Sequence, residues 1–112
     1  MQVNGKELNI NLLSVSFSER FENALKTLKE GADHIKADSL AESLRQQIDC
    51  VKAFVDNVFS PGTYQSLGLD PDDLSVHYDL VDHIIEEVDL QRQKAVTRFD
   101  KYRPNRAARR AK

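Results

Sequence analysis

The residues of this chain that could do chemistry are few, and most are histidines and carboxylates in its second half. His83 precedes Glu86 and Glu87 by three and four residues, a spacing that places three potential metal ligands on one face of a helix. His77 lies six residues before His83, which corresponds to a different helical face. His34, which follows Asp33, is expected to be a surface residue without a partner. One imidazole beside surface carboxylates is a common chance arrangement. We therefore predict no metal site.

The acidic cluster Asp70-Pro71-Asp72-Asp73 is superficially similar to the start of a calcium-binding loop. The turn glycine at loop position 6 and the glutamate at position 12 are both missing, so the cluster is better explained as the acidic start of a helix. The chain also lacks a Ser-His-Asp set, a nucleotide-binding loop and a zinc pattern. We predict no enzymatic activity, no catalytic residues and no bound cofactor.

Length and composition are those of one small domain. The chain has 112 residues, of which 40% are hydrophobic and 30% charged, and no apolar run approaches the length that spans a bilayer. Cys50 is the single cysteine, so a disulfide within one chain is impossible and a cytoplasmic location is expected. The first residues lack a basic head and an apolar stretch, so we expect no signal peptide and no membrane partner.

The N-terminal segment, residues 1–13, has the pattern of a β-hairpin. Asn4-Gly5 is the preferred pair for a two-residue turn of type I′, in which both residues need positive φ. Leu8, Ile10 and Leu12 then alternate with polar residues, as in a strand with one buried face. Because a lone hairpin is marginal in water, it must pack on a helix or pair with a partner.

Three longer segments have helical periodicity, and we predict main helices near 16–36, 39–59 and 74–101. Two capping boxes support the first two starts: Ser16 with Glu19, and Ser39 with Glu42. The predicted fold is mostly α, a small helical bundle of three main helices with a short N-terminal β-hairpin, in one domain over residues 1–102. The predicted core includes Phe21, Leu28, Leu44, Ile48, Val51, Val55, Val81, Ile85 and Val88.

The loop after the second helix is the most distinctive stretch of the chain. Pro61-Gly62 should end the helix, and a further helical turn is expected before Asp73. Tyr64, Leu67 and Leu69 place three apolar groups in this loop. They either plug the end of the bundle or bind a partner.

Charge is distributed in sections along the last helix. Residues 70–89 carry eight acids and no Lys or Arg, whereas residues 92–112 carry nine bases and one acid. The last ten residues, 103–112, hold five bases and no acid, and the other 102 residues hold 11 bases and 18 acids, a net charge of −7. A helix of this length, ~42 Å, exceeds the width of a small domain, so its second half should project or dock on something outside the core.

The basic tail, residues 103–112, has three explanations: a solvated and flexible terminus, a docking segment for a protein, or a nucleic-acid contact. The acidic body and the lack of interleaved aromatic residues make nucleic acid the least favoured partner. We predict that a protein partner engages the distal helix and the tail, through Phe99, Tyr102, Arg103, Arg106, Arg109 and Arg110. The alternative is a homo-oligomer in which the tail contacts the 70–89 acids of another copy.

The loop resembles the motif F-G-x-G-T-x-x-x-(F/L)-G, which small tail assembly chaperone proteins of long-tailed phages carry after their second helix. Four residues match the motif: Phe59, Gly62, Thr63 and Gly68. Three positions differ, since Ser60 replaces a usual glycine, Pro61 a common acid and Leu67 a common phenylalanine. The segment Asn105-Arg106-Ala107-Ala108-Arg109-Arg110 is similar to the N-R-A-x-R-R tail of the same proteins.

This resemblance covers most of the chain and implies a function without catalysis. Such proteins are thought to coat the tape measure protein and to recruit tail tube subunits during tail assembly in the host cytoplasm. The resemblance implies that the loop residues Phe59, Gly62, Thr63, Tyr64, Leu67 and Gly68 contribute to the site. Two other classes remain open, a basic-tailed nucleic-acid-associated or regulatory protein and a structural connector of the virion.

Overall fold

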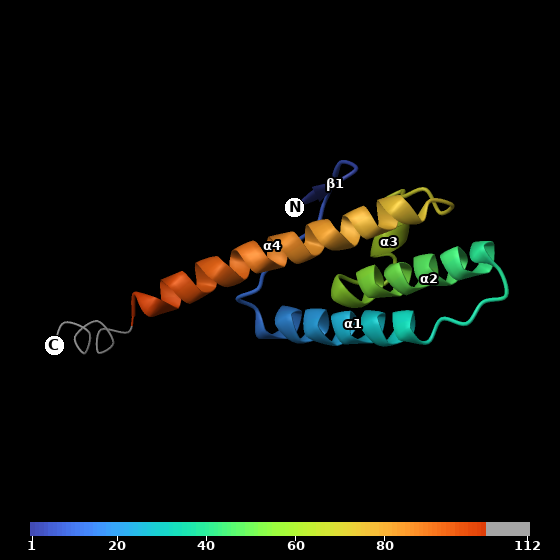
Figure 1. Ribbon diagram of the computed structural model, residues 1–112. Helices are drawn as coiled ribbons and strands as arrows, with labels where there is room; N and C mark the ends of the chain where they lie inside the picture. The colour runs from blue at the N-terminus through green and yellow to red at the C-terminus, as the bar shows by residue number, and fades with distance from the viewer. Residues whose placement is uncertain (103–112) are drawn as a thin grey trace.

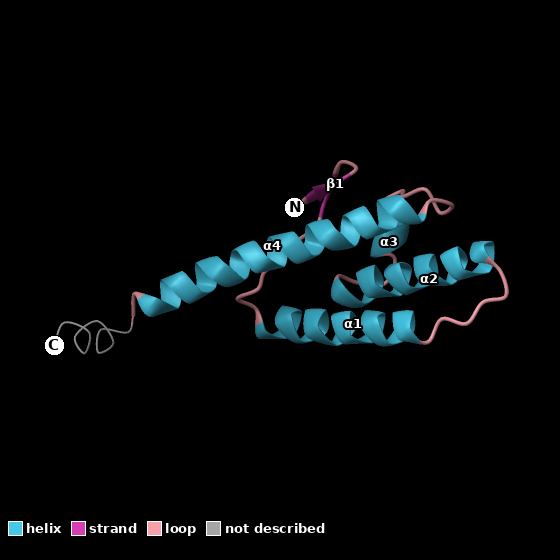
Figure 2. Ribbon diagram, in the orientation of Figure 1, coloured by secondary structure: helices cyan, strands magenta, loops and turns pink. Residues whose placement is uncertain are grey.

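The computed structural model describes residues 1–102, and the predicted basic tail, with Arg103, Arg106, Arg109 and Arg110, lies outside the described residues (Figure 1). The elements follow in the order β1 (Gln2–Val3), β2 (Lys6–Glu7), α1 (Val15–Asp33), α2 (Leu40–Val58), α3 (Thr63–Ser66) and α4 (Leu74–Asp100). The predicted mostly α fold, with three main helices and an N-terminal hairpin, is confirmed (Figure 2). The short helix α3 is the expected helical turn in the loop.

The hairpin turn has the backbone that its sequence predicts. Asn4 has φ 49° and Gly5 has φ 80°, and β1 pairs with β2 in antiparallel register, Gln2 opposite Glu7 and Val3 opposite Lys6. The Asn4 Nδ2 group donates a hydrogen bond to the Leu67 carbonyl at 3.0 Å, which attaches the turn to the loop before α4. The second strand ends at Glu7, so the alternating segment from Leu8 to Leu12 is not part of the paired hairpin. The alternation itself is confirmed by the burial of Leu8 and Ile10.

Helix α1 starts and ends earlier than predicted. The N-cap is Ser14 and not Ser16, because the Ser14 hydroxyl accepts the Phe17 N–H at 3.3 Å. At the other end, the His34 Nδ1–H donates to the Glu30 carbonyl at 2.7 Å and so satisfies an exposed carbonyl of the last turn. The helix therefore ends at Asp33, three residues before the predicted end.

The predicted start of α2 is confirmed, but only one of the two hydrogen bonds of its capping box forms. The Ser39 hydroxyl accepts the Glu42 N–H at 3.1 Å, whereas the Glu42 carboxylate accepts from Arg45 and Gln46. Helix α4 begins as predicted at Leu74, where the Asp73 carboxylate caps the Ser75 N–H at 2.9 Å. The acidic cluster is thus a helix start.

One core joins the three long helices and the hairpin segment. Its most deeply buried side chains are Val51, Phe54, Val55, Val58, Leu67, His77, Ile84 and Val88. The predicted core residues Phe21, Ile48, Val51, Val55, Val81 and Val88 are buried. Leu28 and Ile85 are only half-buried. For Ile85 the reason is that the centre of the buried face of α4 falls on its neighbour Ile84.

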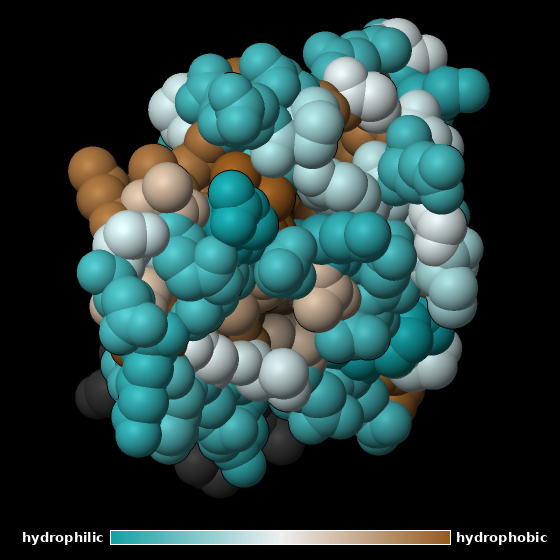
Figure 3. All heavy atoms as spheres, turned by 90° about the vertical axis from the view of Figure 1, so that its right-hand side faces the viewer, coloured by the Kyte–Doolittle hydropathy of each residue, from teal (hydrophilic) through white to brown (hydrophobic). Residues whose placement is uncertain are grey.

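The prediction that Leu44 belongs to the core is wrong, since its side chain is 37% exposed. In Figure 1 the first turns of α2 extend beyond the end of α1 and the start of α4, so neither helix runs alongside their full length. Figure 3 views this end of the molecule, whose surface is mainly hydrophilic with small separate hydrophobic patches. Helical periodicity identifies the correct face of α2 but not the point at which its neighbours end.

Candidate partner-binding surface

The second half of α4 extends past the rest of the bundle. The proximal half packs on the core through Leu80, Val81, Ile84 and Val88. Figure 1 shows the orange-to-red end of the helix running beyond the start of α1 and the end of α2. We refer to residues 91–102 as the α4 arm. A helix of 27 residues is ~40 Å long, so the predicted projection follows from length alone.

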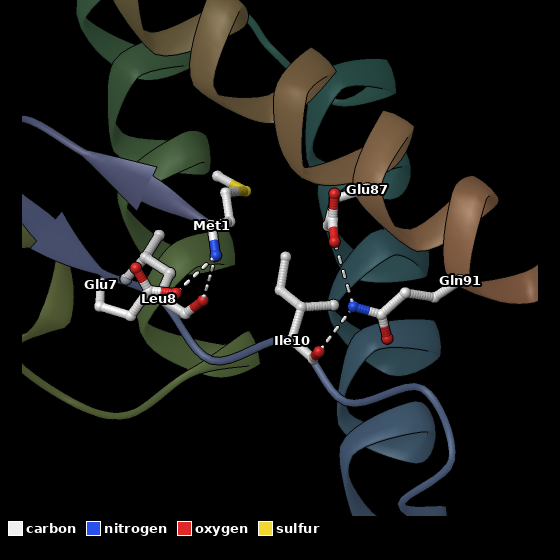
Figure 4. A network of polar contacts seen from close by, with 6 residues as sticks. All are labelled: Met1, Glu7, Leu8, Ile10, Glu87 and Gln91. Atoms are coloured by element: carbon white, nitrogen blue, oxygen red, sulfur yellow. Dashed lines mark hydrogen bonds and ion pairs between the residues drawn. The ribbon is translucent and has the colours of Figure 1, made fainter.

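The side-chain amide of Gln91 attaches the base of the arm to the main chain of residues 10–12 through one donated and one accepted hydrogen bond. The Gln91 Nε2 group donates to the Ile10 carbonyl at 2.7 Å, and the Gln91 Oε1 atom accepts the Leu12 N–H at 3.0 Å. Figure 4 shows the first of these contacts, together with the hydrogen bond from Gln91 to Glu87. This pair of bonds attaches the segment after the hairpin to α4.

We predict that Gln91→Ala releases residues 10–12 from α4 and costs about 1–2 kcal/mol of unfolding free energy, because it removes two hydrogen bonds in a partly buried site. The measurements are urea unfolding and hydrogen exchange at the Leu12 amide, which should exchange faster. Gln93→Ala is the control, since Gln93 is exposed on the same helix. Unchanged exchange at Leu12 would contradict the role given to Gln91.

The apolar stripe of α4 continues onto the arm. After the buried Val88, the spacing of seven, four and three residues leads to Ala95, Phe99 and Tyr102. Ala95 is half-buried, Phe99 is 57% exposed and Tyr102 is 73% exposed. A row of residues that is buried within the bundle is therefore exposed on the arm. Of the predicted partner-binding residues on the distal helix and the tail, the structure describes Phe99 and Tyr102.

A groove of about 190 Å³ lies where the arm meets the segment before α1. Leu12, Leu13 and Ala95 form its apolar part, and Lys94 and Arg98 line it as bases. The arm as a whole holds four bases and one acid, a net charge of +3, whereas residues 1–90 hold 7 bases and 17 acids. This surface therefore combines exposed apolar area with positive charge, in contrast to the acidic residues 1–90.

The distinctive loop closes the end of the bundle. Leu67 is buried, Tyr64 and Leu69 pack against the core, and the Phe59 ring lies 6.3 Å from that of Phe17. Gly62 (φ 89°) and Gly68 (φ 65°) occupy the left-handed region that favours glycine. Two contacts join the loop to the end of α2: the Asp56 carboxylate accepts the Tyr64 N–H at 2.9 Å, and the Ser60 and Thr63 hydroxyls lie 2.8 Å apart. The motif residues thus specify a folded turn, and Tyr64, Leu67 and Leu69 plug the bundle.

His77 is a fully buried residue whose role the sequence did not indicate. Its Nδ1–H donates to the Asp73 carbonyl at 2.7 Å, and its Nε2 atom accepts the Tyr64 hydroxyl at 2.5 Å. Both ring nitrogens therefore have partners, and the contact joins the loop to α4. Its burial could have been predicted from its place in the sequence, because His77 precedes the buried Leu80, Val81 and Ile84 on the same helical face.

One phenol and one carboxyl group near this contact, those of Tyr64 and Asp73, have shifted pKa values. Burial raises the pKa of the Tyr64 phenol above its ordinary value of 10.0, and the Asp49 carboxylate adds to the rise. The hydrogen bond from the Ser75 hydroxyl, followed by that from the Ser75 N–H, lowers the pKa of the exposed Asp73 carboxyl. Both shifts accompany structural contacts, at the plug and at the start of α4.

The raised pKa of Tyr64 predicts a loss of stability in alkali. The folded state binds the phenol proton more tightly than the unfolded state. Its contribution is therefore complete below pH 10 and is lost as pH rises through the raised pKa. We expect the unfolding free energy of the native chain to fall more steeply above pH 10 than that of Tyr64→Phe, measured by urea unfolding. The exposed Tyr78 and Tyr102 remain in both proteins. Equal slopes would contradict the assignment.

Neither a cluster of metal ligands nor a membrane-spanning helix is found in the part of the chain that the structure describes. Over residues 1–102, no three His, Cys, Asp or Glu side chains gather closely enough to hold a metal ion, and His83 is exposed. Within the same range, no helix combines the length and the apolar character needed to cross a bilayer.

Comparison with known proteins gives a family. The sequence profile of DUF6673, a family of unknown function, matches residues 4–112. The chain belongs to DUF6673. No curated protein and no solved structure matches it. The DUF6673 match includes the loop, the α4 arm and the basic tail, so the surfaces described above lie within the segment that defines the family.

Proposed function

We propose that this DUF6673 chain is a non-enzymatic tail assembly chaperone of a long-tailed phage, active in the cytoplasm of the bacterial host. Its partners in this proposal are the tape measure protein and the tail tube protein. The proposal rests on the loop and tail residues that resemble such chaperones. The structural observation that supports it is the α4 arm.

The arm has the properties that a protein-binding surface needs. Phe99 and Tyr102 expose large apolar side chains, and Tyr102 lines one surface together with Lys94, Arg98 and Lys101. Aromatic residues and arginine are the types that contribute most to binding at protein interfaces. The net charge of +3 on the arm favours encounter with an acidic partner. The same charge disfavours pairing of two arms, because like charges would then lie side by side.

The experiment is capture of the tape measure protein from the same phage genome, co-expressed with the native chain or with a chain lacking residues 103–112. We expect the native chain to capture the tape measure protein. The truncated chain should capture it less well while its oligomeric state, measured by light scattering, stays unchanged. Absence of capture by the native chain, or of a tape measure gene in that genome, would contradict the proposal.

Two further measurements test the other two classes. Binding to DNA of any sequence that weakens steeply with salt would favour a nucleic-acid-associated protein. A chain that remains in purified virions would favour a structural connector, since a chaperone is lost before the particle is complete.

A further inference from the structure

The outer edge of β2 borders an open groove of about 370 Å³ that is separate from the α4 arm. We call it the β2 groove. It lies between the hairpin, the first turns of α1 and the loop after α2, and its lining includes Lys6, Asn9, Phe17, Arg20, Phe59 and Thr63. It therefore includes two residues of the loop motif that the plug does not fully bury, Phe59 and Thr63.

The hairpin register leaves main-chain hydrogen-bonding groups pointing at this groove. The Leu8 N–H donates to the Met1 carbonyl at 2.7 Å, and the Met1 ammonium donates to the Leu8 carbonyl and to the Glu7 carboxylate, as Figure 4 shows. Since Met1–Leu8 is a hydrogen-bonded pair, the adjacent pair Gln2–Glu7 is not. The N–H and C=O groups of Glu7 thus point away from β1. Within residues 1–102, no hydrogen bond joins them to another segment.

The groove also carries two bases with no acid paired to them. Within the described residues, neither Lys6 nor Arg20 forms an ion pair, whereas the Glu7 carboxylate is bound by the Met1 ammonium. The Arg20 Nε–H donates to the Val58 carbonyl at 3.3 Å, and the guanidinium carbon lies 5.8 Å from the centre of the Phe17 ring. These contacts hold the guanidinium beside the aromatic pair Phe17–Phe59. The groove therefore has aromatic and positively charged groups next to each other.

We propose that the β2 groove binds an extended segment of another protein, which adds to β2 as a third strand and presents alternating apolar and acidic side chains to the groove. An unpaired strand edge supplies the main-chain hydrogen bonds of such an addition, and alternate side chains of the added strand face the same side. The apolar side chains lie against the half-buried ring of Phe59, which packs on Phe17, and the acidic ones pair with Lys6 and Arg20. This site does not depend on the arm or on the phage assignment.

The test uses two capped eight-residue peptides and amide chemical shifts of the full-length chain. In the first peptide, valine and aspartate alternate on one face with threonine on the other, and in the second lysine replaces aspartate. We expect the aspartate peptide to bind about ten-fold more tightly, because its charge is opposite to that of the groove. It should shift the amides of residues 6–9, 17–20 and 59–66. Lys6→Glu should reverse the preference between the two peptides.

A matched pair of prolines tests the strand addition itself. Glu7→Pro removes the N–H group that faces the β2 groove, and Gln2→Pro removes the equivalent group on the opposite edge of the same hairpin. We expect Glu7→Pro to abolish binding and Gln2→Pro to leave it unchanged. Equal effects of the two prolines, equal binding of the two peptides, shifts confined to other surfaces, or no binding would overturn the proposal. Concentration-dependent shifts of residues 6–9 without peptide would assign the groove to a second copy and also overturn it. Lys6 is exposed, so its variant stays informative if a proline variant does not fold.

Discussion

Val51→Asp is expected to destabilise the fold severely, so that its cooperative thermal transition falls sharply or is lost. The Val51 side chain is fully buried at the centre of α2, among residues of the main core. A carboxylate at this position would have neither solvent nor a partner, and we expect a cost of at least about 4 kcal/mol. Native domains are stable by only about 5–15 kcal/mol, so a cost of this size removes a large part of the margin, and nearly all of it at the lower end of the range.

The measurement for Val51→Asp is circular dichroism during thermal unfolding, with amide spectra as a second observation. Ala53→Asp is a matched control, because Ala53 lies two residues away on the exposed side of the same helix. We expect the control to keep a cooperative transition close to that of the native chain. A native-like transition for Val51→Asp would show that the assigned core face of α2 is wrong.

His77→Ala is expected to cost about 3 kcal/mol of unfolding free energy, from a cavity and from the loss of a hydrogen-bond partner for the Tyr64 hydroxyl. The imidazole is fully buried and joins the plug of the bundle to the first turn of α4. Tyr64→Phe removes the same contact without a cavity and should cost about 1 kcal/mol.

A double-mutant cycle separates this contact from simple packing. If Tyr64 and His77 act together, the double variant should be more stable than the sum of the single effects predicts. His83→Ala is the control, since His83 is exposed on the same helix and its loss should change stability by less than about 0.5 kcal/mol. Additive effects of Tyr64→Phe and His77→Ala would contradict a coupled plug.

Local signals predicted the elements of the fold well. Asn4-Gly5 specifies its own turn, Ser39 caps α2 and the Asp73 cluster starts α4, because each acts within a few residues of chain. The alternation of Leu8 and Ile10 was likewise informative, since one face of that segment is covered by helices.

Features that depend on distant segments were missed. Gln91 binds residues 79 and 81 positions away, and His77 binds Tyr64 across the loop, so neither contact leaves a periodic pattern. Leu44 fits the apolar period of α2 but lies in its first turns, which extend beyond the end of α1 and the start of α4. For the candidate site, the projection of α4 could be predicted from its length. The groove beside Leu12 and Leu13 needed the docking of the hairpin segment, which Gln91 determines.

The central claim is that the α4 arm binds another protein through its exposed apolar stripe and its bases. The most direct measurement is the affinity of the full chain for the co-expressed tape measure protein, compared between Phe99→Ser/Tyr102→Ser and Leu40→Ser. Leu40 is 76% exposed at the opposite end of the molecule, so its variant removes an equally accessible apolar side chain. We expect the arm variant to bind at least about 100-fold more weakly, as loss of two aromatic anchors implies, and the Leu40 variant to bind as the native chain does. Equal affinities of the two variants would contradict the claim.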